Sequence, residues 1–367
     1  MLYYLDNYVS QSGNPNENYA REMFELHTMG AENYLGTVRP DNFPVLAGVT
    51  AGFAQPCPTG YYDWDVFETA RALTGWRVSD NEAPNQGSTN DGSFYYREGQ
   101  HDKGQKIILG QQIYPNAAAE DDGLRALAWL SAHPGTGRYI ARKLCRRLIG
   151  DFPPQSIVDA AAALFTAQKD ANDQIAQVLQ LILTSAEFKA AWGEKFKRPF
   201  EFAASAVRAV GGNLSFYGLQ YGDELSYSSY DAIGQPVYGR RPPDGFPDVK
   251  GAWTNTTSVL MRWRFANTLM ENDIRANLNA NIKYAGEIKV DVIAQTPANL
   301  TTANALADFW INRILGRPTA ASGTRDEMVR FMRGTFQPTS ILPPTDITDR
   351  LPRMVALILM CPDFQLK

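Results

Sequence analysis

Residues 14–30 read Asn14-Pro15-Asn16-Glu17-Asn18-Tyr19-Ala20-Arg21-Glu22-Met23-Phe24-Glu25-Leu26-His27-Thr28-Met29-Gly30, and they form the most informative helical stretch of the chain. Asn14 before Pro15, with Glu17 at the third position, matches a capping box, which satisfies the free N–H groups of a first helical turn. Gly30 is the residue type that usually follows a helix end. The stretch therefore predicts a helix over Pro15–Met29.

Helical patterns of the same kind continue along most of the chain. Asp65 predicts the N-cap of a second helix, because Glu68 follows three residues later and Gly75 can end it. Apolar residues spaced three and four apart predict further helices at 120–132, 137–148, 157–168, 173–183, 186–191, 200–210, 258–271, 304–315, 325–334 and 348–360. The fold class predicted is mostly α, a multi-helix orthogonal or bundle-like arrangement.

Two segments interrupt the helical pattern. The β-prone runs at 93–96 and 106–109, around Gly99 and Gly104, predict one small β-hairpin inside an insertion at 76–118. Residues 213–257 are rich in Gly, Pro and aromatic residues, and predict one long aromatic-rich loop. We expect a single α-helical domain over 1–367 that carries both features.

The composition and the motifs missing from the sequence argue against several classes of protein. The chain has 367 residues, 44% of them hydrophobic and 20% charged, with a net charge of −4, which is typical of a globular protein. This charge argues against nucleic-acid binding through a basic field. No window is apolar enough for a membrane span, and the first residues lack the features of a signal peptide. The P-loop, dinucleotide, zinc-protease and G-x-S-x-G motifs are missing from the sequence, which disfavours their chemistries. Three cysteines, Cys57, Cys145 and Cys361, allow at most one disulfide bond.

The first predicted helix carries two acidic candidates. Glu22 and Glu25 lie about 60° apart around the helix axis. The pair suits a divalent cation, or proton transfer if the two environments separate their pKa values. The alternative is structural, with Arg21 pairing with Glu25. His27 falls on the other side of the helix, where a core position is expected.

Arg71, on the second predicted helix, is the natural counter-ion for Glu22 or Glu25 if the two helices pack together. A guanidinium can bind a carboxylate through two parallel hydrogen bonds. Either Arg71 holds an anionic group of a substrate beside the glutamates, or it forms a buried clamp between the helices.

Histidines add two further positions. His101-Asp102 in the hairpin segment places an imidazole beside a carboxylate, which suits general acid–base work or a cation site. Asp102-Lys103-Gly104 is also ordinary turn chemistry. His133 precedes Pro134 between two predicted helices, where a hydrogen bond to a carbonyl is expected.

Several motifs together resemble one bacterial family, the domain of unknown function 1800. The resemblance covers nearly the whole chain and is carried by residues 14–22 and 25–30, 70–76, 101–102 with 106 and 109–110, 133–134 with 140–144, 197–202, and 234–236 with 245–248. Members of the family usually have a further helical region before the stretch resembling Leu2–Asn7, often behind an export signal. The resemblance therefore implies a missing N-terminal region and export to the periplasm or the exterior.

Two hypotheses on function follow. The first is an exported hydrolase of a polysaccharide or another polymer, in which Glu22, Glu25 and Asp102 transfer protons while Arg71 and His101 orient them. Aromatic and acidic residues of the loop at 213–257 would suit a sugar-binding cleft. The second is a non-catalytic binding or assembly module of the cell envelope, with an envelope protein as partner. The sequence leaves the substrate, any metal or cofactor, and the oligomeric state open.

Overall fold

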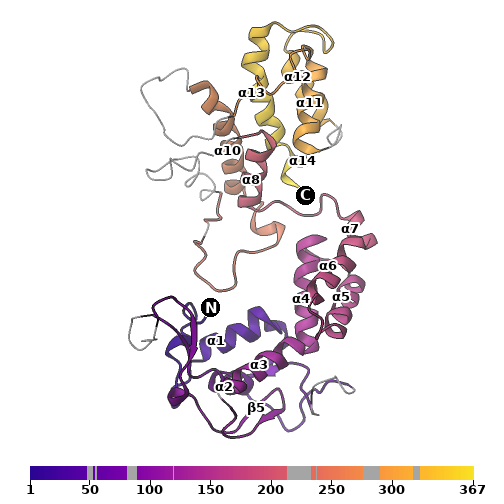
Figure 1. Ribbon diagram of the computed structural model, residues 1–367. Helices are drawn as coiled ribbons and strands as arrows, with labels where there is room; N and C mark the ends of the chain where they lie inside the picture. Colours follow the sequence, from indigo (N-terminus) through magenta and orange to yellow (C-terminus); the bar gives the residue numbers. More distant parts are fainter. Residues whose placement is uncertain are drawn as a thin grey trace. The chain divides into compact units, whose positions relative to one another are not determined.

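The computed structural model describes residues 1–47, 53, 56–80, 89–118, 120–212, 233–236, 238–275, 290–316 and 323–367. These residues form two compact units (Figure 1). Unit 1 comprises Met1–Leu148 and Phe152–Ala190, and unit 2 comprises Ile149–Asp151 and Ala191–Lys367. Helices dominate both units, as predicted, whereas the single domain over 1–367 stays a prediction.

Unit 1 contains seven α-helices among its described residues. Its α-helices are α1 (Glu17–Glu22), α2 (Asp63–Ala72), α3 (Asp121–Ala132), α4 (Pro134–Leu148), α5 (Gln155–Ala167), α6 (Gln174–Thr184) and α7 (Ala186–Ala190). Short 3-10 helices add Asn7–Val9, Ala31–Asn33 and Glu98–Gln100. Figure 1 shows α4, α5 and α6 side by side, and most of the predicted helices lie within a few residues of the observed ones.

The strands form three two-stranded sheets. The strands are β1 (Tyr34–Gly36), β2 (Tyr61–Tyr62), β3 (Trp76–Val78), β4 (Phe94–Tyr96), β5 (Lys106–Ile108) and β6 (Gln111–Ile113). β1 and β2 are parallel, while β3–β4 and β5–β6 are antiparallel. The predicted pairing of 93–96 with 106–109 is wrong. Leu109 and Gly110 have φ of 50° and 75°, the tight two-residue turn that folds β5 back onto β6.

The first helix differs from its prediction at both ends. Its N-cap is Asn16, whose side chain accepts from the backbone N–H of Asn18 at 2.9 Å, rather than Asn14. After Glu22 the backbone continues as a π-helix over Met23–His27. A π turn inside an α-helix is uncommon and is found mostly as a local bulge, often at functional sites. It changes the face on which residues after Glu22 lie.

The second helix begins at Asp63, two residues before the predicted N-cap. Asp65 is the third helical residue, and its carboxylate accepts from the backbone N–H of Tyr62 at 2.9 Å and of Leu109 at 2.7 Å. The Asp65 side chain therefore fastens the turn between β5 and β6 to the start of α2. Burial raises the pKa of Asp65, because the loss of hydration destabilises the carboxylate more than these two hydrogen bonds stabilise it.

The core of unit 1 lies between the first helices and the β5–β6 hairpin. Residues from α1 to α3 contribute to it, among them Phe24, Tyr61, Leu73, Ile108 and Leu130. The polar network described below lies at one edge of this core.

Unit 2 is a helical bundle. Its helices are α8 (Pro199–Ala209), α10 (Thr256–Arg275), α11 (Ala303–Leu315), α12 (Thr324–Arg333), α13 (Pro344–Met360) and α14 (Pro362–Gln365). Figure 1 shows α11, α12 and α13 packed side by side around a core that includes Phe202, Trp310 and Met354. Of the predicted loop at 213–257, residues 213–232 and 237 lie outside the described residues, and Lys250–Ala252 form a 3-10 helix.

Two expectations from composition can be compared with the structure. Cys57, Cys145 and Cys361 are buried and form no disulfide bond among the described residues. Within the described ranges, no helix combines the length and the apolar character that crossing a membrane requires.

Candidate functional site

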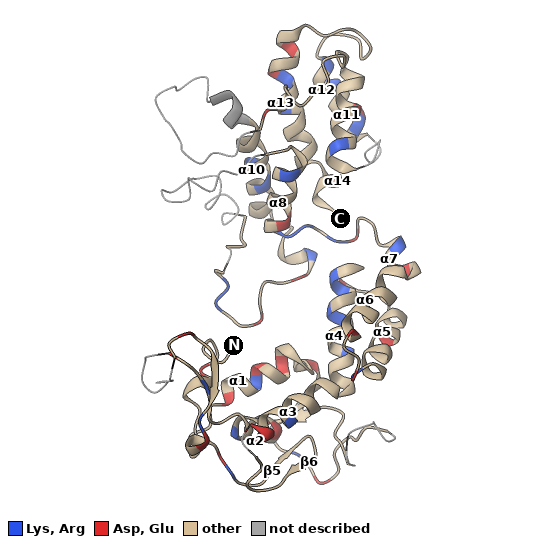
Figure 2. Ribbon diagram, viewed as in Figure 1, with Lys and Arg blue, Asp and Glu red and all other residues tan. Residues whose placement is uncertain are grey.

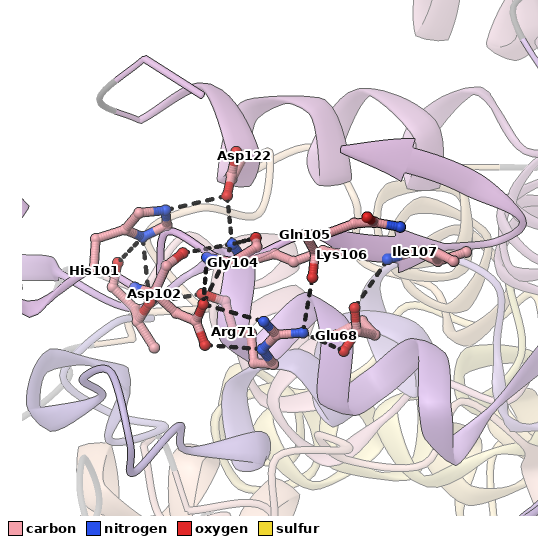
Figure 3. A network of polar contacts seen from close by, with 10 residues as sticks. Glu68, Arg71, His101, Asp102, Gly104, Gln105, Lys106, Ile107 and Asp122 are labelled. Carbon is pink, nitrogen blue, oxygen red and sulfur yellow. Dashed lines mark hydrogen bonds and ion pairs between the residues drawn. The ribbon is translucent and has the colours of Figure 1, made fainter. Parts of the chain in front are cut away.

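The structure separates the five candidate residues into two places in unit 1. Arg71, His101 and Asp102 lie in one polar network between α2 and the segment that leads into β5 (Figure 3). Glu25 lies instead in the π-helix beside Arg21, and Glu22 is the last residue of α1.

Arg71 forms the centre of the first half of this network. Its Nε and Nη2 donate to the two carboxylate oxygens of Asp102, at 2.8 and 3.1 Å. Its Nη1 donates to Glu68 Oε1 at 2.6 Å and to the carbonyl of Gln105 at 3.1 Å. The other oxygen of Glu68 accepts from the backbone N–H of Ile107 at 2.9 Å. Arg71 thus links α2 to the hairpin segment. The predicted pairing of Arg71 with Glu22 or Glu25 is wrong, because its carboxylate partners are Glu68 and Asp102.

His101 and Lys106 form the second half around Asp122 on α3. His101 Nε2 lies 3.1 Å from Asp122 Oδ2, and its Nδ1 lies 2.8 Å from the carbonyl of Thr74. Each ring nitrogen of His101 therefore lies within hydrogen-bond distance of an oxygen. Lys106 Nζ donates to the same Asp122 oxygen at 2.6 Å and to two backbone carbonyls of the preceding turn. One carboxylate oxygen therefore contacts both Lys106 and His101.

Burial distinguishes the two halves. The side chains of His101, Asp122 and Lys106 are at most 3% exposed, whereas those of Arg71 and Asp102 are 19% and 20% exposed. Burial alone would raise the pKa of Asp122, but hydrogen bonds from His101 and Lys106 outweigh it and hold the pKa below its usual value. The pKa of Asp102 is lowered too, because Arg71 outweighs the cost of burial. Both carboxylates are therefore held ionised.

Local backbone geometry positions these groups. Asp102 Oδ1 accepts from the N–H of Gly104 at 2.8 Å, which is the Asx turn expected from the sequence. A Cβ at Gly104 would come within 2.8 Å of Arg71 Nη2. Gly75, with φ of 82°, ends the turn after α2, where a Cβ would meet the carbonyl of Arg97 at 2.8 Å. Glycine at both positions therefore lets backbone and guanidinium approach closely.

A second polar cluster surrounds Glu25. Arg21 Nη1 lies 3.7 Å from Glu25 and 3.1 Å from Asp63, so the expected pairing of Arg21 with Glu25 is confirmed. Tyr34 donates to Asp63 at 3.1 Å. The Tyr61 hydroxyl is buried and has no hydrogen-bond partner among the described residues. Burial raises the pKa of the Tyr61 hydroxyl, and the charge of Glu25 raises this pKa further. This cluster is partly exposed, with Glu25 and Asp63 side chains 30% and 34% accessible.

Histidines outside the network have different roles. His27 is exposed, so the predicted core position is wrong, because the π turn rotates the end of the helix. His133 is fully buried, and its Nε2 lies 3.0 Å from the carbonyl of Pro58, which confirms the expected hydrogen bond. Its Nδ1 accepts from the N–H of Gly135 at 3.0 Å.

Three charged partners in the network, Glu68, Lys106 and Asp122, were not among the predicted site residues. Glu68 was detectable, because its spacing of three from Arg71 places both on one helix face. Lys106 lies two residues before Ile108 in one strand, so both side chains point to the same, buried face. Nothing in the sequence around Asp122 indicates its burial or its partners.

Neither cluster has the donor set of a metal site. In the part of the chain that the structure describes, no three His, Cys, Asp or Glu side chains are grouped to hold a metal ion. A surface pocket of about 470 Å³ lies between α4 and α5 and is lined partly by Arg138, Asp159 and Thr166. It contains none of the five candidate residues.

Comparisons with known proteins give one match. A family model described as a protein of unknown function, DUF1800, matches residues 1–366. No curated protein and no solved structure matches the chain.

Proposed function

Since the chain belongs to the DUF1800 family, whose function is unknown, we propose that it is a non-catalytic binding or assembly module of the bacterial cell envelope. In this proposal the network of Arg71, His101 and Asp102 holds unit 1 together and carries out no chemistry.

One observation carries this proposal: the donors of the network are bonded to protein acceptors. Arg71 directs its three nitrogens at Asp102, Glu68 and a backbone carbonyl. Both ring nitrogens of His101 face acceptors as well. A general acid or base must reach the proton that it transfers. Groups whose donors are all bonded in this way are better suited to fixing the hairpin segment against α2 and α3.

Retention and turnover on the same polysaccharides test this function. The chain is incubated with a panel of insoluble polysaccharides, and both bound protein and released reducing ends are measured. A binding module is retained on at least one of them without releasing reducing ends. Release by the wild-type chain that His101→Gln abolishes, at a temperature where the variant is folded, would contradict the proposal.

A hydrolase is the second candidate, and one observation favours it. Glu25 and Asp63 are partly exposed and share one nitrogen of Arg21, so two carboxylates lie close together at the surface. Glycoside hydrolysis usually needs two such acids. In this candidate Glu25 and Asp63 flank the scissile bond of a polysaccharide, and Glu22 lies on the preceding helix.

Variants that remove one charge at a time separate the candidates. A hydrolase loses turnover in Glu25→Gln and Asp63→Asn and keeps it in Glu32→Gln, an exposed glutamate that pairs with Arg142. The Glu22→Gln variant tests whether Glu22 takes part. Equal turnover in Glu25→Gln and the wild-type chain would exclude Glu25 from the mechanism.

The envelope location is part of the proposal and rests on the family resemblance. Fractionation of cells that express the natural gene, with an immunoblot of each fraction, tests it. Protein confined to the cytoplasmic fraction would contradict an envelope role.

A further inference from the structure

A cluster of cationic side chains lies in unit 2 where α8 begins. Lys197 and Arg198 immediately precede α8, and Arg262 reaches them from α10. Figure 2 shows lysine and arginine residues along the segment that enters α8. The amino-terminal end of a helix adds positive potential at this place.

Arg262 is completely buried and has neutral hydrogen-bond partners. Its Nη2 donates to the carbonyl of Lys197 at 2.7 Å, and its Nη1 donates to Gln365 Oε1 at 3.2 Å. Its guanidinium lies over the rings of Phe196 and Phe202, at 4.5 and 5.1 Å from their centroids. Burial lowers its pKa to about 10. A buried charge that no opposite charge contacts is costly, so an anion at this place would stabilise it.

Two buried N–H donors in this cluster lack an acceptor. The Nε atoms of Arg198 and Arg262 are buried, and neither has a hydrogen-bond partner among the described residues. Lys197 is half-buried beside them, and its Nζ lies 3.6 Å from the centre of the Phe364 ring. Buried donors in folded proteins are nearly always paired with protein, water or ions. A bound group with acceptor atoms would match the two arginine donors.

The nearby acid, Glu201, already has cationic partners. Both of its oxygens lie 2.9 Å from Lys367 Nζ, its Oε1 lies 3.4 Å from Arg198 Nη2, and it accepts from the backbone N–H of Arg198 at 3.0 Å. Burial lowers the pKa of Lys197 to about 8, while the charges around it act in both directions. The low pKa of Lys197 therefore reflects its removal from water.

We propose that Lys197, Arg198 and Arg262 form an oxyanion-binding site of unit 2, which binds a phosphate or carboxylate group of a ligand. The oxygens of such a group supply the acceptors that the two arginine Nε donors lack, and its charge compensates Arg262 and Lys197. Arginine and lysine both bind such groups, arginine through paired hydrogen bonds and lysine as a point charge. The inference stands on unit 2 alone and is independent of the role proposed for the network in unit 1.

The reactivity of the Lys197 amine tests the site in the unmodified chain. Trace acetylation with acetic anhydride at pH 8, with mass spectrometry of each lysine, measures the fraction of neutral amine. Inorganic phosphate and acetate are added in separate arms at constant ionic strength. A bound oxyanion raises the pKa of Lys197, and a rise of about one unit slows its acetylation about fivefold at pH 8. The exposed Lys189 is the internal reference.

The two arms identify the preferred oxyanion. Slowing of Lys197 by phosphate alone identifies a phosphoryl ligand, and slowing by acetate identifies a carboxylate ligand. Both results support the site. An unchanged ratio of the Lys197 and Lys189 rates in both arms, or equal slowing of the two lysines, would overturn it.

Calorimetric titration with the effective anion gives a second, independent measurement. Lys197→Met keeps the aliphatic part of the side chain on the Phe364 ring and removes the charge, whereas Lys189→Met removes the same charge elsewhere. We expect about tenfold weaker binding in Lys197→Met, because a charged hydrogen bond is lost, and wild-type binding in Lys189→Met. Wild-type affinity in Lys197→Met would overturn the site, and so would an equal loss in both variants.

Discussion

Lys106 Nζ lies 2.6 Å from Asp122 Oδ2, with both side chains at most 3% exposed. Lys106 belongs to β5 and Asp122 to the first turn of α3, so this ion pair joins the hairpin to the helix. His101 adds a second contact to the same oxygen. The pair explains how a lysine is tolerated in the core of unit 1, because a buried charge needs a close partner of opposite sign.

Asp122→Asn should strongly destabilise the protein. The change leaves Lys106 buried without its counter-charge, and breaking one partner of a buried pair costs about 3–5 kcal/mol. Urea unfolding followed by circular dichroism measures this loss. Asp121→Asn is the matched control, because Asp121 is adjacent, is partly exposed, and pairs with Arg125 at the surface. That control should change stability by about 0.5 kcal/mol or less. Equal losses in the two variants would contradict a buried ion pair at Asp122.

His133 should make stability depend on pH on the acidic side. Burial lowers the pKa of His133 to about 4, whereas an unfolded chain titrates near about 6.5. Between these values the unfolded state binds more protons, so this contribution is constant above pH 6.5 and is lost as the pH falls toward 4. The loss reaches about 3 kcal/mol, measured by urea unfolding at several pH values.

His133→Asn should remove this pH dependence. Asparagine accepts well from backbone N–H groups at helix starts and does not titrate, so it can replace the bond to Gly135. The variant is less stable near neutral pH because it loses the bond to Pro58, but its stability between pH 6.5 and 4 is flatter. His27→Asn, at an exposed position, should leave most of the dependence in place. An unchanged slope in His133→Asn would assign the dependence to other groups.

Tyr61→Phe should leave stability unchanged or raise it by about 1 kcal/mol, because it removes a buried hydroxyl that has no partner among the described residues. Tyr34→Phe is the opposite case, since its hydroxyl donates to Asp63. It should lower stability by about 1 kcal/mol. Thermal unfolding of both variants checks the pair. A large loss in Tyr61→Phe would show that the hydroxyl has a partner in solution.

Gly30→Ala should destabilise unit 1 by about 3 kcal/mol or more, from backbone strain and a steric clash together. Gly30 has φ of 84°, and a Cβ there would lie 2.3 Å from a ring carbon of Tyr139. Gly13→Ala separates the two effects, because Gly13 has φ of 83° with no atom within 4 Å of the added carbon. That control should cost about 1 kcal/mol in thermal or urea unfolding. Similar losses in both variants would rule out the clash.

Local patterns identified most of the helices because helix formation depends on residues a few positions apart. Apolar spacing predicted the helices of both units to within a few residues, and Gly30 and Gly75 stand beyond helix ends as expected. The sequence did not predict the π turn at Met23–His27. It also did not predict that β4 pairs with β3 and β5 with β6. Both depend on contacts with segments outside the helix or hairpin concerned.

The sequence predicted several residues of the candidate site, but not how they pair. Arg71 and Asp102 were chosen from the sequence, but their pairing joins residues 31 positions apart and depends on how α2 meets the hairpin segment. The contrast between buried His101 and exposed His27 also depends on tertiary packing.

The helical class, the family and the residues able to carry charge can be identified from short stretches of sequence, because periodicity, capping and motifs involve neighbouring positions. Which of these charges are paired, buried or uncompensated follows from how distant segments pack. Asp122 Oδ2 contacts both Lys106 and His101, and Arg262 contacts no carboxylate among the described residues. The physical reason is that the electrostatic energy of a side chain depends on its distance to partners and its exclusion from water, and the packing of distant segments sets both.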